Sequence, residues 1–166
     1  MVTTRATGFA VRPATREDAD ALAHVNAVVQ ALHHEHLPSW FKPPDAVGTA
    51  DLFRQWLDDP VVRLSIAEAD NGEPLGYVLA RVIEAPASAL TYAATIVELD
   101  QIAVVPDHRR RGVGRALVDA VKELADSVDA GRVQLTVWEF NGPAQQFFAA
   151  NGFTVAMRRM LLADRA

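Results

Sequence analysis

The chain has 166 residues, of which 50% are hydrophobic and 22% are charged, a composition typical of one soluble globular domain. Its 16 basic and 21 acidic residues leave a net charge of −5, which argues against a general binding surface for nucleic acid or for anionic membranes. The absence of cysteine excludes disulfides, thiolate nucleophiles and cysteine zinc sites, so only His, Asp and Glu could bind a metal.

No segment reaches the roughly 20 apolar residues of a membrane span, and residues 1–10 lack the apolar run of a signal peptide. No internal repeat, low-complexity tract or Gly/Ser linker divides the sequence. We therefore expect a single domain over residues 1–166 that acts in the cytoplasm, with no nucleic-acid or membrane partner.

The first third of the chain predicts a strand followed by two helices. Thr15 and Asp18 have the spacing of a capping box, and apolar residues follow them at helical spacing. Three prolines between Leu37 and Val47 predict a loop, because proline interrupts regular structure. In chain order, we expect a strand over Phe9–Pro13, a helix that begins at Thr15, this loop, and a short helix over Thr49–Leu57.

The middle of the chain predicts a hairpin and a long strand. Apolar and polar residues alternate over 62–66, an Asn-Gly pair follows at 71–72, and a second strand is expected over Leu75–Ile83. The next strand is expected between Thr95 and Val105. Its alternation changes phase near Asp100–Ile102, which predicts a β-bulge, a feature that often re-aims side chains at a site.

The last part of the chain predicts two further helices and two further strands. Pro143 occupies the position of a proline in the first turn of a helix, and Gly152 follows the end of that helix. The expected elements are a helix between Gly112 and Gly131, a strand over Val133–Val137, a helix from Pro143, and a final strand over Phe153–Leu162. The order β-α-α-β-β-β-α-β-α-β indicates an α/β fold, with a mixed sheet and helices on its faces.

Arginines and glycines cluster in Arg109–Arg115, between the long strand and the next helix. Gly112 and Gly114 let the backbone approach a ligand, and the amides and positive dipole end of the helix favour an anion. Guanidinium groups pair well with phosphate oxygens, so we predict a phosphate site. The segment matches neither a Walker A loop nor a dinucleotide-binding fingerprint, and the alternative is a tight turn with solvated arginines.

The stretch Leu99–Leu117 closely resembles the acetyl-coenzyme A motif of the GCN5-related N-acetyltransferases, the GNAT family. The family loop reads Gln or Arg, any two residues, Gly, any residue, Gly or Ala, and Arg109–Gly114 matches it. A second block resembles the family's last helix and strand, through Asn141, Ala144, Phe147, Phe148, Gly152 and Phe153. The resemblance implies a GNAT-like α/β fold, with a mixed, mostly antiparallel sheet, helices on both faces, and a V-shaped cofactor cleft beside the long strand.

The resemblance also implies acetyl-coenzyme A as co-substrate and no metal. The pantetheine arm would bind the backbone of the long strand, and the pyrophosphate would bind the loop amides. The implied cofactor-binding residues are Ile102, Ala103, Val104, Arg109, Arg110, Arg111, Gly112, Val113, Gly114, Arg115, Asn141 and Phe148.

Acyl transfer to an amine needs a neutral amine and a proton for the departing thiolate. The resemblance implies Glu98, on the long strand, as the catalytic base, and Asp100 is the alternative. Many family members have a tyrosine acid where this chain has Phe148, which cannot donate a proton. The thiolate would then take its proton from water or Tyr92, or leave without an acid.

We expect an N-acetyltransferase that moves an acetyl group to a primary amine of a small molecule or peptide by direct attack. A catalytically weak acyl-coenzyme A binding module is the alternative that Phe148 favours. A nucleic-acid binder that uses the arginine cluster is disfavoured by the net charge.

Three histidines, His33, His34 and His36, lie at the end of the first predicted helix. Adjacent side chains on a helix point apart, which disfavours a metal site and leaves a place beside the acceptor, near Trp40 and Phe41, as the better interpretation. The segment Ala85–Ala94 suits a substrate lip or a homodimer contact equally well.

Overall fold

The structure is a computed structural model that describes residues 4–6 and 8–162. It divides into two compact units, Met1–Thr136 and Val137–Ala166. The first unit contains the whole sheet with helices α1 to α3, and the second contains helix α4 (Gly142–Ala150). Among the described residues, no helix combines the length and the apolar character needed to cross a membrane.

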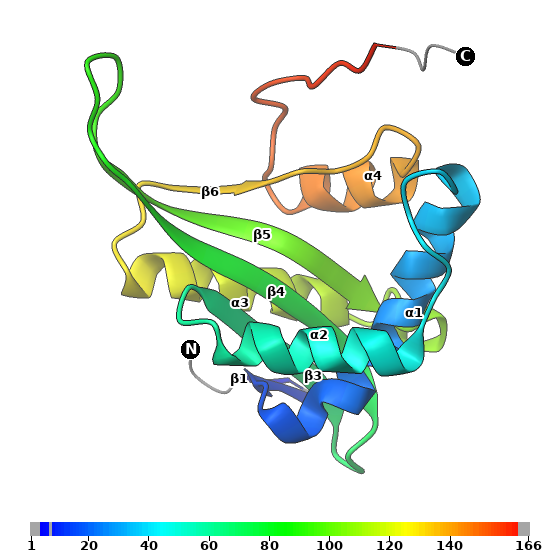
Figure 1. The fold of residues 1–166 in the computed structure, drawn as a ribbon. Helices are drawn as coiled ribbons and strands as arrows, with labels where there is room; N and C mark the ends of the chain where they lie inside the picture. The colour runs from blue at the N-terminus through cyan, green and yellow to red at the C-terminus, as the bar shows by residue number, and fades with distance from the viewer. Residues whose placement is uncertain (1–3, 7, 163–166) are drawn as a thin grey trace. The chain divides into compact units, whose positions relative to one another are not determined.

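Six strands form one mixed sheet in chain order (Figure 1). Each pair of neighbours is antiparallel except β5 and β6, which are parallel. The strands are β1 (Thr4–Ala6), β2 (Phe9–Pro13), β3 (Val62–Ala69), β4 (Pro74–Ala85), β5 (Ala94–Val104) and β6 (Arg132–Leu135). The predicted mixed, mostly antiparallel sheet is confirmed, and β1 is a strand that the sequence pattern did not predict.

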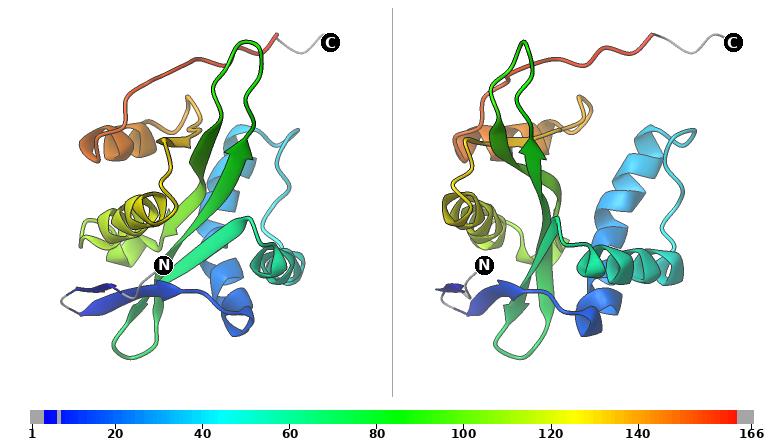
Figure 2. Two further views of the ribbon diagram at one scale, coloured as in Figure 1. Left: turned by 90° about the vertical axis from the view of Figure 1, so that its left-hand side faces the viewer. Right: turned by 60° about the vertical axis from the view of Figure 1, so that its left-hand side comes forward.

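Helices cover both faces of this sheet (Figure 2). Helices α1 (Ala19–His36) and α2 (Ala46–Asp58) lie on one face, and α3 (Val113–Ser127) lies on the other. Each helix buries one apolar stripe, as its periodicity requires. The largest fully buried side chains of the face under α1 and α2 are Leu22, Phe53, Ile66, Tyr77 and Leu79.

Several element boundaries differ from the predicted ones by a few residues, as the start of α2 and the end of β6 illustrate. Helix α2 begins at Ala46, before the predicted Thr49, because the Asp45 carboxylate accepts a hydrogen bond from the Gly48 backbone N–H at 3.2 Å and caps the helix. Strand β6 ends at Leu135 rather than at Val137.

The predicted final strand, Phe153–Leu162, is wrong, because these residues have no strand structure. A strand exists only where its backbone groups pair with a neighbouring chain segment, whereas alternation of side chains records only a preference for such a surface. Apolar side chains of the segment are therefore exposed, including Val155, Met157 and Met160.

The predicted hairpin and the predicted bulge are both confirmed. Strands β3 and β4 pair across the Asn71-Gly72 turn, where the Glu73 backbone N–H donates to the Asn71 side-chain oxygen at 3.1 Å. Between β4 and β5, Ala80 lies opposite Leu99 and Leu79 lies opposite Gln101. Asp100 is therefore the extra residue of a bulge.

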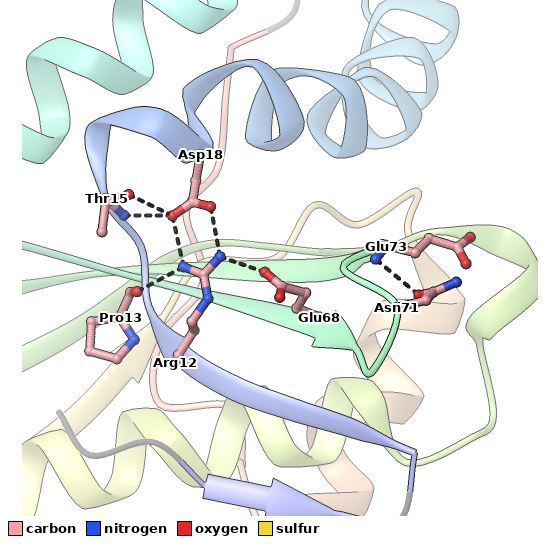
Figure 3. A network of polar contacts seen from close by, with 7 residues as sticks. All are labelled: Arg12, Pro13, Thr15, Asp18, Glu68, Asn71 and Glu73. Carbon is pink, nitrogen blue, oxygen red and sulfur yellow. Dashed lines mark hydrogen bonds and ion pairs between the residues drawn. The ribbon is translucent and has the colours of Figure 1, made fainter.

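A charged network ties the start of α1 to the sheet (Figure 3). The two terminal nitrogens of Arg12 on β2 donate to the Asp18 carboxylate at 2.8 Å each, and Arg12 also donates to Glu68 on β3. The Thr15 backbone N–H donates to Asp18 at 2.7 Å, which is the contact that the capping-box spacing predicts. The hydrogen bonds from Arg12, with that from Thr15, lower the pKa of Asp18 from 3.8 to about 2.

The Asp18→Asn variant should be less stable than the wild type at neutral pH by at most about 2 kcal/mol, because a carboxyl with a lowered pKa stabilises the folded state while it is ionised. The difference should persist above about pH 4 and shrink as the pH falls through about 2, since the protonated wild-type carboxyl loses the same interactions. Urea denaturation over this pH range measures it.

Asp20→Asn is the matched control, because Asp20 pairs with Arg54 while its side chain is 79% exposed. That change should cost less than about 0.5 kcal/mol at any pH. A loss for Asp18→Asn that does not vary with pH would contradict the role assigned to its ionised carboxylate.

Candidate active site

Strand β5 has an edge beyond the bulge with which no strand of the described residues pairs, called here its open edge. Strand β6 pairs with β5 only from Ile96 to Leu99, so the pairing stops where the bulge begins. Further on, the Val105 backbone N–H donates to Leu75 at the start of β4 at 3.0 Å. Because successive residues turn their backbone groups to opposite edges, the N–H and C=O groups of Ile102 and Val104 point away from β4, to the edge that β6 leaves open.

The bulge places two successive polar residues, Asp100 and Gln101, on the sheet face that α1 and α2 cover. Gln101 lies opposite Leu79, and Asp100 accepts a hydrogen bond from Arg81 at 3.0 Å. Arg81 also lies 3.9 Å from the Asp59 carboxylate. The carboxylate of Asp100 is thus paired with a cation.

Glu98 lies on the same face, opposite Arg81 in the register of β4 and β5. Its side chain accepts a hydrogen bond of 3.1 Å from the amide of Gln134 on β6, which is a neutral partner. Glu98 is only half-buried. Of the two candidate bases, Asp100 is hydrogen-bonded to a cation, whereas the hydrogen-bond partner described for Glu98 is a neutral amide.

The arginine-rich loop leads from β5 to α3. It follows the short 3-10 helix η2 (Pro106–His108), and Gly112 adopts a left-handed conformation, φ 87°, as the N-cap of α3. The first backbone bond of α3 runs from Ala116 N–H to Gly112 C=O. The three N–H groups of residues 113–115 therefore point out of the helix start, where they and the helix dipole can bind an anion.

Four exposed arginines surround these amides, at positions 109, 110, 111 and 115. The Arg109 side chain folds back along the loop, and its Nε donates to the Val104 carbonyl at 3.2 Å. The open edge of β5 and the cationic helix start are thereby adjacent within one compact unit. An extended ligand with a phosphate group at one end could use both.

Gly76 is a residue of this site that the sequence analysis did not single out. It lies on β4 opposite Val104, and a Cβ built on it would lie 2.6 Å from the Ala103 carbonyl oxygen and 3.2 Å from Leu117 of α3. Only glycine leaves room on β4 for both the Ala103 carbonyl of the neighbouring strand and the Leu117 side chain of α3. A lone glycine inside a strand pattern was the available signal.

The two remaining predicted cofactor residues belong to the second compact unit. Asn141 caps α4, where its side-chain oxygen accepts a hydrogen bond from the Ala144 backbone N–H at 3.2 Å. Phe148 is buried, with its ring 5.3 Å from that of Phe147 and 5.7 Å from that of Phe153. Both residues thus have a structural role within their own unit.

The histidines at the end of α1 hold the proline-rich loop that follows. His34 Nδ1 lies 2.8 Å from the Phe41 carbonyl oxygen, and the His33 ring lies 4.7 Å from the Phe41 ring. Burial lowers the pKa of His33, with a smaller effect from His36. In the described part of the chain, no group of three or more His, Asp or Glu side chains is arranged to hold a metal.

The segment 85–94 forms the tip of the β4–β5 hairpin. Leu90 and Tyr92 are almost fully exposed there. The substrate lip and the homodimer contact both stay predictions for this segment.

The structure has a mixed sheet, a bulged strand β5 and an arginine-rich helix start that follows this strand. The sequence resemblance implies these features for an acyltransferase that uses coenzyme A. The sequence matches the Acetyltransferase (GNAT) family over residues 27–153, and the chain belongs to this family. The family predicted from the two sequence blocks is confirmed. No curated protein matches the sequence.

Solved structures share the fold at low sequence identity. A tetramutant of the BH1408 protein from Bacillus halodurans is 18% identical, with a TM-score of 0.87 over 92% of this chain and 97% of that chain. The aminoglycoside N-acetyltransferase AAC(6')-Iy in complex with CoA is 17% identical, with a TM-score of 0.75 over 100% and 98%. The aminoglycoside 6'-N-acetyltransferase AAC(6')-Ih from Acinetobacter baumannii is 18% identical, with a TM-score of 0.73 over 96% and 99%.

Replacing Gly76 with alanine should destabilise the protein by about 1–3 kcal/mol, because the new methyl group meets a backbone oxygen that cannot move aside alone. Gly131→Ala is the control, since a Cβ there comes no closer than 3.9 Å to the Thr95 carbonyl oxygen. Chemical denaturation compares the two variants. Equal stability of both would show that the Ala103 carbonyl oxygen does not lie as close to Gly76 as described.

Proposed function

We propose that the protein transfers an acetyl group from acetyl-coenzyme A to a primary amine of a small-molecule or peptide acceptor by direct attack. The observation that carries the proposal is the open edge of β5 beside the arginine-rich start of α3. Membership of the GNAT family supports it. A neighbour in complex with a bisubstrate analogue of CoA and acetylneamine, 20% identical, favours a small-molecule amine as acceptor.

The cofactor would bind as an extended segment along β5. In this proposal its pantetheine amides pair with the backbone of Ile102 and Val104, and Arg109 releases the Val104 carbonyl to make room. The pyrophosphate binds the N–H groups of residues 113–115 and the arginines around them. Two further contacts with the cofactor are proposed. One is the side-chain nitrogen of Asn141, whose side-chain oxygen caps α4, and the other is the ring of Phe148.

The chemistry is one acyl transfer. The amine nitrogen attacks the thioester carbonyl carbon, a C–N bond forms, and the C–S bond breaks. Glu98 accepts the proton that the amine loses, directly or through a water molecule. The thiolate of coenzyme A takes its proton from water, because Phe148 cannot donate one.

A catalytically weak acyl-coenzyme A binding module is the second candidate, and Phe148 favours it. Release of free thiol from acetyl-coenzyme A in the presence of a panel of primary amines separates the two candidates. Amine-dependent release supports the transferase, whereas tight cofactor binding with no release from any amine supports the binding module.

Gly114→Asp should abolish the binding of coenzyme A, because it places a carboxylate in the first turn of α3, against the proposed pyrophosphate. Isothermal titration calorimetry measures the affinity. Lys122→Gln is the control, since it lowers the charge of the same helix by one at an exposed position away from the helix start. Unchanged affinity in a folded Gly114→Asp variant would mean that the loop is only a turn.

Glu98→Gln should lower turnover by a factor on the order of 10² to 10⁴, the usual cost of a lost general base, with little change in cofactor affinity. Asp100→Asn is the matched comparison, because it changes the other carboxylate of the same strand. Rates measured across the pH range decide between them. If Glu98→Gln keeps full activity and Asp100→Asn does not, Asp100 is the base.

A further inference from the structure

Three polar side chains form a hydrogen-bonded cluster within the hydrophobic core between α1 and the sheet. Asn26 comes from α1, Tyr77 from β4 and Gln101 from β5. Asn26 Nδ2 donates to the Tyr77 hydroxyl at 2.7 Å, and that hydroxyl donates to Gln101 Oε1 at 2.7 Å. Asn26 Nδ2 also reaches Gln101 Oε1 at 3.3 Å.

Two members of the cluster are buried, and the third, Gln101, is half-buried. Tyr77 has no exposed surface and Asn26 is 8% exposed. Burial raises the pKa of Tyr77, so its hydroxyl keeps the proton that it donates. Buried polar groups are costly when any one of them loses its partner, so this cluster favours one arrangement of its three elements over others.

The arrangement that it favours contains the bulge. With the extra residue Asp100 in place, Gln101 lies opposite Leu79 on the face of α1 and α2. Without the bulge, Gln101 would share a face with Leu99, which points to the opposite side, because side chains alternate along a strand. The hydrogen bond between Tyr77 and Gln101 can therefore form only in the bulged register.

Side chains of β4 contact both Asp100 and Gln101, and only the contact with Gln101 requires the bulge. Tyr77 binds Gln101 inside the core, and Arg81 binds Asp100 at the exposed side at 3.0 Å. Phe53 of α2 supports the inner contact, with its ring edge-on to that of Tyr77 at 5.2 Å. The bulge in turn determines which backbone groups of β5 face the open edge.

We propose that Asn26, Tyr77 and Gln101 are positioning residues for the cofactor. Their hydrogen bonds fix the bulge, and the bulge directs the backbone groups of Ile102 and Val104 toward the pantetheine arm. This inference rests on the proposed function, since it assumes that coenzyme A binds along β5. In this proposal the three residues do not act on the pyrophosphate, because the pyrophosphate binds the loop before α3.

Two probes separate positioning from mere stability: coenzyme A, and adenosine 3′-phosphate 5′-diphosphate, which lacks pantetheine. In Tyr77→Phe, which removes only the hydroxyl, coenzyme A should bind roughly five- to tenfold more weakly, as for the loss of one hydrogen bond. The affinity for the nucleotide should not change, because the loop is intact. Calorimetry on the full chain measures both affinities.

Ile66→Val is the matched control, because it removes one methylene group from the same core cluster without touching the hydrogen bonds. It should lower stability and leave both affinities as in the wild type. Gln101→Met, which keeps the length of the side chain and removes the acceptor, should repeat the selective loss even if Tyr77→Phe does not fold.

The outcomes are distinct. Equal weakening of both probes, or no weakening of either in a folded variant, overturns the positioning role and leaves the proposed function standing. A wild-type protein that binds neither probe overturns the proposed function, and the positioning role with it.

Discussion

The extra residue of the bulge on β5, which has no counterpart on β4, determines the geometry beside the candidate site. Asp100 has no partner across the ladder, so the strand bends and its pairing with β6 ends at Leu99. Beyond that point, the backbone groups of β5 on the open edge pair with no strand in the part of the chain that the structure describes.

Hydrogen bonds between side chains of three elements, α1, β4 and β5, stabilise the bulge. Gln101 reaches Tyr77 and Asn26 only in the bulged register. A polar cluster inside an apolar core is less stabilising than apolar packing, but its hydrogen bonds favour one arrangement of the surrounding elements over others. Here the unique arrangement lies next to the candidate site.

The distribution of charge also suits an anion at the start of α3. The chain carries a net charge of −5, yet its loop before α3 concentrates arginines around unpaired helix amides. A local positive field within a negative molecule favours a small anionic ligand over a polyanion, because a long polyanion would also meet the repulsive remainder of the surface. Gly76 and Gly112 contribute by shape. Gly76 leaves room on β4 for the Ala103 carbonyl and the Leu117 side chain, and Gly112 allows the left-handed turn at the helix start.

The sequence by itself determined what local periodicity and turn chemistry control. The hairpin at Asn71-Gly72, the bulge near Asp100 and the cationic loop Arg109–Arg115 were all predicted, because each depends on residues close together in the chain. Tertiary structure alone decided the rest. The pairing of Asp100 with Arg81 joins residues distant in sequence, as does the cluster around Tyr77. The alternating pattern of Phe153–Leu162 predicted a strand that is absent, because a strand needs a hydrogen-bonded neighbour and no local pattern supplies one.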